Sequence, residues 1–508
     1  MTRKTAKTNS KNGCVTCKIR HVKCGEERPT CVQCTSTGRK CDGYVDASQR
    51  QLRRRREGPS LPLKVSPESR LVLVPGTRQE RDFLNMFSTE TCHSLSGLFH
   101  SDLWLYYIPQ LSQTQPAIRH AVAAVSAAHK CLLAPVTETE KTSNFALEQY
   151  NKAIRALLDS SHPRFSNLDL TLITCALFVC LETVTGNNPQ AMDHAQAGLR
   201  ILARRQGTPG APDPEFPISD GINRELSDLF SLLNIECSTR GRKMIPYKAH
   251  MEQPTQSDKI KFTTILQARR ALVHITTPSF QLVQRITSLP QNVSGLEQQE
   301  RFQEQQRLRK EHNEWWIAFQ QLQKRRPKSR AGASTDPRAP LVLIVQHHAT
   351  AILNETLLRQ DEMIYDNFVS EFEEMVEAAE KISELSPKNG YRQTYNLEPY
   401  VGLSLYWAAR KCRHPLIRRR AAAVIRASPQ LDSMHDLEVL YHTAIYNIER
   451  EEASVAHLPV EHRVPECQDR FWETFMPNEK HSNPCQIIFV RKEGAESDYK
   501  MEEDYVHW

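Results

Sequence analysis

Six cysteines fall within 28 residues near the start of the chain, and their spacing could support metal or disulfide chemistry. The set consists of Cys14, Cys17, Cys24, Cys31, Cys34 and Cys41. The pattern is one unit, Cys-x2-Cys-x6-Cys, written twice with six residues between the copies. Thiols this close in so short a segment are either metal ligands or a disulfide framework.

The rest of the sequence favours metal over disulfides. The first residues, MTRKTAKTNSKNG, are polar and basic and contain no apolar segment typical of a secretory signal. The longest apolar runs, such as ITCALFVCL at 173–181, are too short to cross a bilayer. We therefore expect a soluble intracellular protein, and in that reducing compartment clustered cysteines bind metal.

The ligand count distinguishes two metal-bound arrangements. Zinc takes four ligands in a tetrahedron, so one zinc ion would use four of the cysteines and leave two thiols over. Two zinc ions need eight ligand positions, which six thiolates fill only if two of them bridge both ions. The duplicated unit suits two zinc ions, with one half around each. A segment of about 28 residues buries too little apolar area to fold alone, so metal binding must supply its folding free energy.

Positive charge is concentrated at the same end of the chain. Residues 1–60 contain 15 Lys and Arg against 5 Asp and Glu, a net charge of +10. The whole chain carries +7, which leaves −3 for the remaining residues. This asymmetry indicates a nucleic-acid partner for the N-terminal end alone. A merely solvated basic tail is the alternative.

The cysteine module resembles the fungal binuclear zinc cluster family of DNA-binding domains, which place a short helix in the major groove. The resemblance rests on the cysteine spacing, the basic segment CKIRHVKC, Pro29 two residues before Cys31, and the closing GRKCDGY. It implies that Cys14 and Cys31 bridge the two zinc ions. Cys17 and Cys24 would then complete one site, and Cys34 and Cys41 the other.

The segment between the second and third cysteines is the expected reader of DNA. A cation that reaches O6 and N7 of guanine is the commonest specific base contact. The resemblance implies base contacts for Arg20 and His21, at the helix C-terminus, and phosphate contacts for Lys18 and Lys23. His21 stands where the family more usually has Lys or Arg, which puts a CGG-type triplet in doubt. The alternative for each basic residue is a phosphate contact that carries no sequence information.

We divide the chain into four parts. Residues 1–13 are expected to form a disordered basic tail, and 14–41 the zinc cluster. Residues 42–76 are a basic, Pro-containing linker, and 77–508 an all-α regulatory domain, either a helical bundle or an array of helical pairs. The linker carries an Arg run at 50–56, interpreted as a nuclear-import signal, a phosphate-binding tail or a solvated charged segment.

The body shows helical spacing throughout. Thr77-x-x-Glu80 has the spacing of a capping box, and Pro116 marks the first turn of another helix. Further helical patterns cover 145–158, 168–184, 190–205, 220–236, 258–288, 296–326, 341–359, 364–384, 399–411, 415–427 and 436–452. CQIIFV at 485–490 is one of the few strand-like runs, and no alternating βαβ signal is present.

The body also resembles the fungal transcription-factor regulatory domain. The passages that carry this resemblance are 99–129 and 405–425, while 426–434 depart from the Arg-Glu-Gly-x-Trp pattern associated with this place. We find no Gly-rich phosphate loop, nucleophile elbow or His-Glu-x-x-His motif, so an enzyme is not expected.

Together these features predict a nuclear, zinc-dependent, sequence-specific regulator of genes transcribed by RNA polymerase II. Its expected cofactors are two zinc ions, and its partners are double-stranded promoter DNA and the transcription machinery, with no membrane. One module reads only about three base pairs, so a homodimer or a second DNA contact is expected. Because no zipper pattern follows the module, either the body pairs or a monomer uses the Arg run. The alternative is a zinc-containing interaction protein that does not read DNA.

Overall fold

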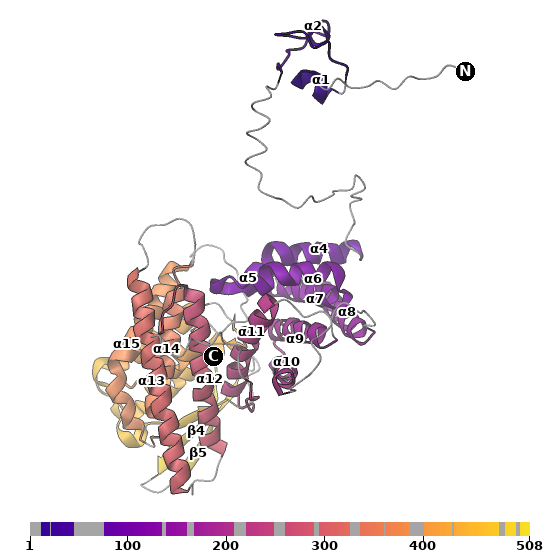
Figure 1. Ribbon diagram of the computed structural model, residues 1–508. Helices are drawn as coiled ribbons and strands as arrows, with labels where there is room; N and C mark the ends of the chain where they lie inside the picture. The colour runs from indigo at the N-terminus through magenta and orange to yellow at the C-terminus, as the bar shows by residue number, and fades with distance from the viewer. Residues whose placement is uncertain are drawn as a thin grey trace. The chain divides into compact units, whose positions relative to one another are not determined.

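A computed structural model gives the fold, and it divides the chain into two compact units, Met1–Leu73 and Val74–Trp508 (Figure 1). The residues that the structure describes are 12–20, 22–44, 76–134, 139–159, 167–207, 220–247, 260–288, 294–325, 336–359, 361–386, 401–428, 431–476, 483–493 and 498–508. Most of the expected tail, most of the linker with its Arg run, and His21 lie outside them.

The first unit is built around cysteines. Two short helices, α1 (Val15–Ile19) and α2 (Val32–Thr35), each begin directly after a cysteine that serves as the N-cap residue, Cys14 and Cys31. The buried cluster of this unit consists of five of the six cysteines, with Cys41 half-buried beside them. The folded core of this unit therefore consists of the candidate ligands themselves.

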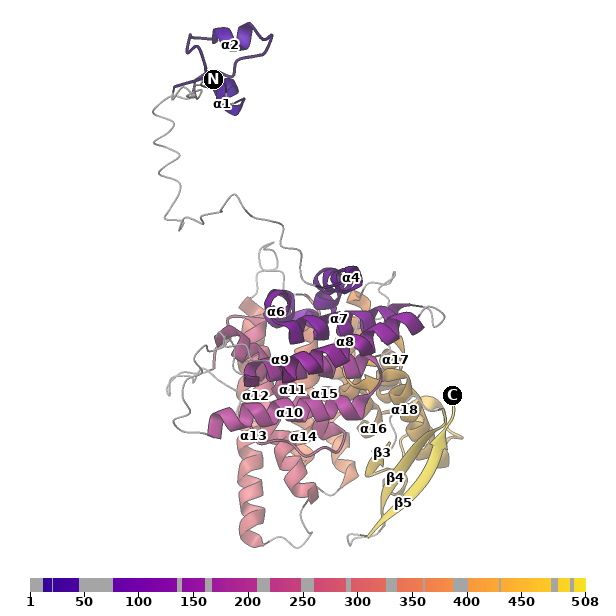
Figure 2. The same cartoon turned by 90° about the vertical axis from the view of Figure 1, so that its right-hand side faces the viewer.

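The second unit begins with helices that pack around α7 and α9. Their bounds are α4 (Arg78–Met86), α5 (Cys92–Ser96), α6 (Ile108–Thr114), α7 (Pro116–Leu133), α8 (Glu140–Leu158), α9 (Asn167–Val184), α10 (Asn188–Gly207) and α11 (Asp220–Thr239). The capping box at Thr77 and Glu80 is present, and Pro116 is the first residue of α7 as predicted. Helix α7 packs on α8 and α9, and α9 packs on α10, so that the helices form successive layers (Figure 2).

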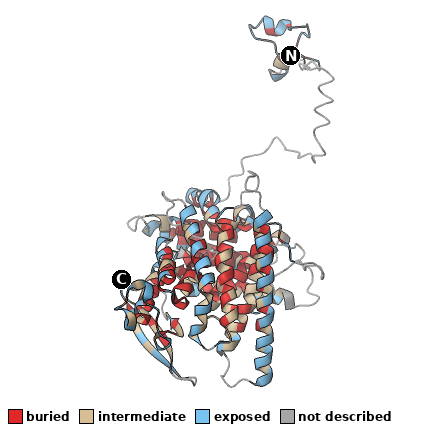
Figure 3. Cartoon of the chain, turned by 90° about the vertical axis from the view of Figure 1, so that its left-hand side faces the viewer, coloured by how far each residue is buried: buried red, intermediate tan, exposed pale blue. Residues whose placement is uncertain are grey.

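The second half of this unit has its own hydrophobic core. Its helices are α12 (Ile265–Ser288), α13 (Gly295–Arg325), α14 (Ala339–Thr356), α15 (Val369–Leu385), α16 (Gly402–Lys411), α17 (Pro415–Ala427) and α18 (Leu437–Glu451). Helix α14 packs on α12, α13 and α15, while α16 packs on α17 and α18. The buried residues concentrate on the inward faces of the helices (Figure 3). The predicted helical body is thus confirmed.

Two β-elements complete the fold. A tight hairpin joins β1 (Leu431–Asp432) to β2 (His435–Asp436) between α17 and α18. Near the C-terminus, β3 (Glu473–Phe475), β4 (Cys485–Glu493) and β5 (Asp498–Val506) form an antiparallel sheet in the order β3-β4-β5. The strand-like run at 485–490 lies in β4 as predicted. Among the described residues, no helix combines the length and apolar character needed to cross a bilayer.

Candidate metal centre and DNA-contacting surface

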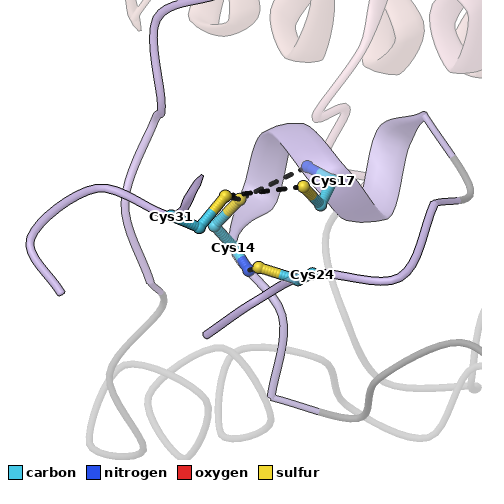
Figure 4. Close-up of side chains that lie close together, drawn as sticks. All are labelled: Cys14, Cys17, Cys24 and Cys31. Atoms are coloured by element: carbon cyan, nitrogen blue, oxygen red, sulfur yellow. Dashed lines mark hydrogen bonds between the residues drawn. The ribbon is translucent and has the colours of Figure 1, made fainter. Parts of the chain in front are cut away.

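The six cysteines of the first unit come together as two sets of four. In each set all the sulfur atoms lie within 4.8 Å of one another, and both sets contain Cys14 and Cys31. The remaining members are Cys17 and Cys24 in one set, and Cys34 and Cys41 in the other. Figure 4 shows the first set, in which Cys14 directly precedes α1 and Cys17 lies within it. The chain that follows α1 supplies Cys24 and Cys31. Across the described residues, groups of His, Cys, Asp and Glu close enough to hold a metal ion occur among these six cysteines alone.

The sulfur separations match the geometry of a tetrahedral thiolate site. Cys14 and Cys31 Sγ lie 3.6 Å apart, and so do Cys17 and Cys31 Sγ. Zinc–sulfur bonds of about 2.3 Å at tetrahedral angles place sulfur atoms about 3.8 Å apart. The separations are also far longer than a disulfide bond of about 2.05 Å, and all six cysteines are free thiols. The donor set therefore fits zinc.

A third combination of four sulfurs is also close. Cys34 Sγ lies 3.8 Å from both Cys14 and Cys17 Sγ. The sulfur atoms of four cysteines, Cys14, Cys17, Cys31 and Cys34, therefore all lie close to one another. Used as one site, Cys14, Cys17, Cys31 and Cys34 would leave Cys24 and Cys41 without a role. The count of bound ions distinguishes this arrangement from the two sets that share a pair.

Backbone N–H groups prepare the sulfurs for a cation. The Cys17 N–H donates to Cys14 Sγ (3.4 Å), and the N–H groups of Cys14 and Glu26 donate to Cys24 Sγ (3.3 and 3.4 Å). Burial raises the pKa of the Cys24 thiol, but the N–H donors, together with the Tyr44 hydroxyl and Cys31, outweigh burial and bring the pKa to about 6. Burial dominates at Cys17 and raises its pKa to about 12. A bound cation is what stabilises several thiolates in so small a volume.

The closing segment of the module is bonded back to its first helix. The Thr16 hydroxyl donates to Asp42 Oδ2 (2.8 Å) and accepts from the Asp42 N–H (3.0 Å), while the Val15 N–H donates to the Gly43 carbonyl (3.0 Å). The Tyr44 hydroxyl donates to the Glu27 carbonyl (2.7 Å). Sequence reasoning assigned no role to Thr16, Asp42 or Tyr44, although the last two lie in the quoted segment GRKCDGY.

Three of the four expected DNA-contacting residues, Lys18, Arg20 and Lys23, lie among the described residues of the first unit, and His21 lies outside them. Lys18 and Lys23 are exposed, and Arg20 is half-buried at the C-cap of α1. The Arg20 guanidinium donates through Nη1 to Thr37 Oγ1 (3.2 Å), which ties it to the second half of the module. Ile19, which sequence reasoning did not single out, is 71% exposed between Lys18 and Arg20. Its signal in the sequence is an apolar residue inside a basic segment.

Two family profiles match the chain. The one described as "Fungal specific transcription factor domain" matches residues 82–385, which is more than half of the chain. The one described as "Fungal Zn(2)-Cys(6) binuclear cluster domain" matches residues 12–51. The second match implies that the cysteines bind zinc.

Curated relatives match over part of their length. The Aspercryptin biosynthesis cluster-specific transcription regulator atnN of Emericella nidulans is 35% identical over 219 residues, which cover 39% of this chain and 35% of that protein. Transcription regulator lscL of Purpureocillium lilacinum is 28% identical over 210 residues, which cover 39% of this chain and 50% of that protein. The chain thus spans about a third to a half of the length of these relatives. No solved structure matches it.

Proposed function

This chain belongs to the family of fungal transcription regulators, and we propose that it is a nuclear, zinc-dependent regulator that reads promoter DNA in a sequence-specific way. The observation that carries the proposal is the sharing of Cys14 and Cys31 between two close sets of four thiols. That arrangement is the one expected of a module whose fold is stabilised by bound metal, and the basic residues Lys18, Arg20 and Lys23 beside it can bind DNA. The helical second unit would be the regulatory part.

The proposed cofactor is a pair of zinc ions. Cys17 and Cys24 would complete one site, Cys34 and Cys41 the other, with Cys14 and Cys31 as bridges. When bound, zinc supplies the positive charge that offsets the buried thiolates and fixes the two halves of the module to each other. The N–H donors at Cys14 and Cys24 orient the sulfurs, as outer-shell partners do in other metal sites.

Native mass spectrometry of the zinc-loaded chain measures the ion count. The shared-pair arrangement predicts two zinc ions in the wild type and loss of metal on replacing either bridge, as in Cys31→Ser. A single zinc ion in the wild type that is retained in both Cys24→Ser and Cys41→Ser would contradict this arrangement. It would instead favour one site formed by Cys14, Cys17, Cys31 and Cys34.

The proposed DNA-binding surface is the exit of α1. Arg20 and His21 would contact base edges, and Lys18 and Lys23 would contact phosphates. The hydrogen bond from Arg20 to Thr37 limits the directions that the guanidinium can take, which lowers the entropy lost on binding. Exposed Ile19 offers an apolar contact of the kind made with a thymine methyl group.

The proposed biological role is control of a narrow set of genes through the transcription machinery. One named relative is specific for a biosynthesis cluster, and this chain would act in the same pathway-specific manner. Since one module reads about three base pairs, either a homodimer formed through the body or a monomer with a second DNA contact is needed.

Mapping bound sites across the genome of the host cell tests this role. Wild-type protein should occupy a small number of promoters that share a short motif, and Arg20→Ala should lose that selectivity. A wild-type map without discrete sites would instead fit a zinc-containing interaction protein that does not read DNA.

A further inference from the structure

A cavity of about 100 Å³ lies within the second unit, between α11, α12, α14, α16 and the β1–β2 hairpin. Its walls are mainly apolar, with Ile235 from α11, Leu272 and Phe280 from α12, and Leu403 from α16. An engineered apolar cavity of about 150 Å³ admits benzene, so this smaller volume accommodates part of a ring or the end of a branched chain.

A few polar groups interrupt the apolar walls. Glu236 Oε1 and His435 Nε2 form an ion pair at 2.9 Å, and both side chains are almost fully buried. Burial raises the pKa of Glu236, but the facing His435 imidazole, together with the Arg240 guanidinium and the Met434 backbone, outweighs burial and lowers it, so Glu236 stays a carboxylate. Thr276 and Ser404 line other walls. A few polar groups in an apolar concavity are the usual composition of a small-molecule site.

The hairpin beside the cavity connects the two hydrophobic cores of the unit. Met434 is buried in the first core, and its carbonyl accepts from Asn188 Nδ2 (3.1 Å) and from the Arg240 guanidinium. Two residues earlier, Asp432 Oδ2 accepts from the N–H groups of Val401 (3.0 Å) and Gly402 (2.6 Å) at the start of α16. An occupant of the cavity would therefore touch both halves of the unit and the hairpin that joins them.

We propose that this cavity binds a small, uncharged, mainly apolar molecule carrying a hydroxyl group, and that its binding stabilises the β1–β2 hairpin. The lining residues offer an anion no cation beyond His435, which already faces Glu236, and the apolar walls cannot repay the cost of desolvating a charged molecule. A hydroxyl can donate to a carboxylate and accept from Thr276 or Ser404. Since the site is formed entirely by the second unit, its occupancy can be measured without zinc or DNA.

Fluorine NMR on the full chain tests the binding, with 4-fluorobenzyl alcohol as the probe and 4-fluorotoluene as its counterpart without a hydroxyl. The alcohol resonance should broaden and saturate with protein, and the toluene should bind at least threefold more weakly. Thr276→Phe fills the cavity and should abolish binding. Thr287→Phe places the same side chain on the exposed face of the same helix and should bind as the wild type does.

Amide hydrogen exchange measures the coupling to the hairpin. With 4-fluorobenzyl alcohol, exchange at residues 431–436 and at the start of α16 should slow at least threefold in the wild type and in Thr287→Phe. The exchange rate should not change in Thr276→Phe, whose cavity is filled. If Thr276→Phe does not fold, Val273→Phe serves as the filled variant, because Val273 also lines the cavity. Absence of binding to the wild type, unaltered binding to the filled variant, or an unchanged hairpin would each overturn the proposal. None of these results depends on DNA recognition.

Discussion

At the scale of single residues, Arg20 and Lys23 occupy different environments although both are cations beside α1. The Arg20 guanidinium is held by Thr37 Oγ1 at 3.2 Å, whereas Lys23 is exposed. A positioned guanidinium can reach two acceptors on one base edge, while a lysine on a long stem acts as a point charge. The two residues should therefore contribute to DNA binding in different ways.

Replacing Arg20 by Ala should reduce discrimination between the preferred site and a mismatched site by about 1–3 kcal/mol. Replacing Lys23 by Ala should weaken all sequences alike and lower the salt slope by about one. Titrations of both variants against matched and mismatched duplexes at several salt concentrations separate these effects. Equal losses of discrimination in the two variants would show that the assigned roles are wrong.

A second residue-scale feature is the buried carboxylate of Glu451. Its two oxygens lie 3.0 Å from Arg413 Nη2 and 2.6 Å from Arg418 Nη2, and the Phe471 N–H donates to it at 2.8 Å. Burial alone would raise the pKa of Glu451, but the two guanidinium groups outweigh burial and lower it from 4.5 to about 2. The group thus joins α17 and α18 to the segment that leads into β3.

Glu451→Gln should lower the free energy of unfolding of the second unit by up to about 3–5 kcal/mol at pH 7, because it removes a carboxylate shared by two buried cations. Each cation then keeps one carboxylate partner, Glu362 for Arg413 and Glu452 for Arg418. Since the folded-state pKa is depressed, the carboxylate stabilises the fold fully above about pH 4.5. That stabilisation is lost as the pH falls towards 2. Urea unfolding of both proteins should therefore show a difference that shrinks over this range.

The control for this comparison is Glu377→Gln, which removes a carboxylate paired with Lys381 at 3.4 Å on the surface. Exposed pairs contribute about 0–1 kcal/mol, so little change is expected. If Glu451→Gln lowers the free energy of unfolding no more than Glu377→Gln does, the structural role assigned to the buried carboxylate is contradicted.

At the scale of elements, α10 and α11 approach closely at Gly198. A Cβ atom at this position would lie 2.2 Å from Cε1 of Phe230, whose ring is fully buried. Alanine usually improves a helix interior by about 1 kcal/mol over glycine. Here overpacking, which typically costs about 1–3 kcal/mol, should outweigh that gain.

Gly198→Ala should therefore destabilise the second unit by about 1–2 kcal/mol in urea unfolding. Adding Phe230→Leu should recover part of this loss, because the smaller side chain makes room for the methyl group. Gly295→Ala, at the start of α13 with no atom within 4 Å of the added Cβ, is the matched control. Equal stability of Gly198→Ala and Gly295→Ala would rule out the close approach.

The helices were predictable because their apolar residues repeat at helical spacing and their ends carry recognisable signals. Thr77, Glu80 and Pro116 are examples of such signals. The β1–β2 hairpin and β5 were not predicted. Strand β5, DYKMEEDYV, is rich in acidic residues that strands disfavour, and it is held by pairing along the whole of β4. Tertiary contacts of this kind leave no local periodicity in the sequence.

At the scale of the whole molecule, the two units hold themselves together by different means. The buried cluster of the first unit consists of cysteines, whereas the second unit has two large apolar cores. Structural zinc contributes about 10–16 kcal/mol to the folding of small domains. Metal removal should therefore affect only one of the units.

Treatment with the chelator 1,10-phenanthroline should raise amide exchange throughout residues 12–44 to the rate of an unfolded chain. Protection of α7 and α9 should stay unchanged, because no candidate metal site was found among the described residues of the second unit. Hydrogen exchange read by mass spectrometry resolves the two regions. Loss of protection in both together would contradict independent stabilisation.

The cysteine positions and their duplicated spacing were sufficient to predict that the six thiols come together. The supporting contacts were not predictable, because the bonds from Thr16 to Asp42 and from Tyr44 to Glu27 join residues 26 and 17 positions apart. Single hydrogen bonds over such separations have no repeating pattern. The role of His21 stays a prediction, since this residue lies outside the described part of the first unit.

The central claim is that a zinc-held module at the N-terminus reads DNA sequence, and selection from a pool of random duplexes tests it most directly. With the zinc-loaded chain, repeated rounds should enrich a short GC-rich motif, and chelation should abolish the enrichment. Selection that yields no motif, or a motif that persists after zinc is removed, would contradict the claim.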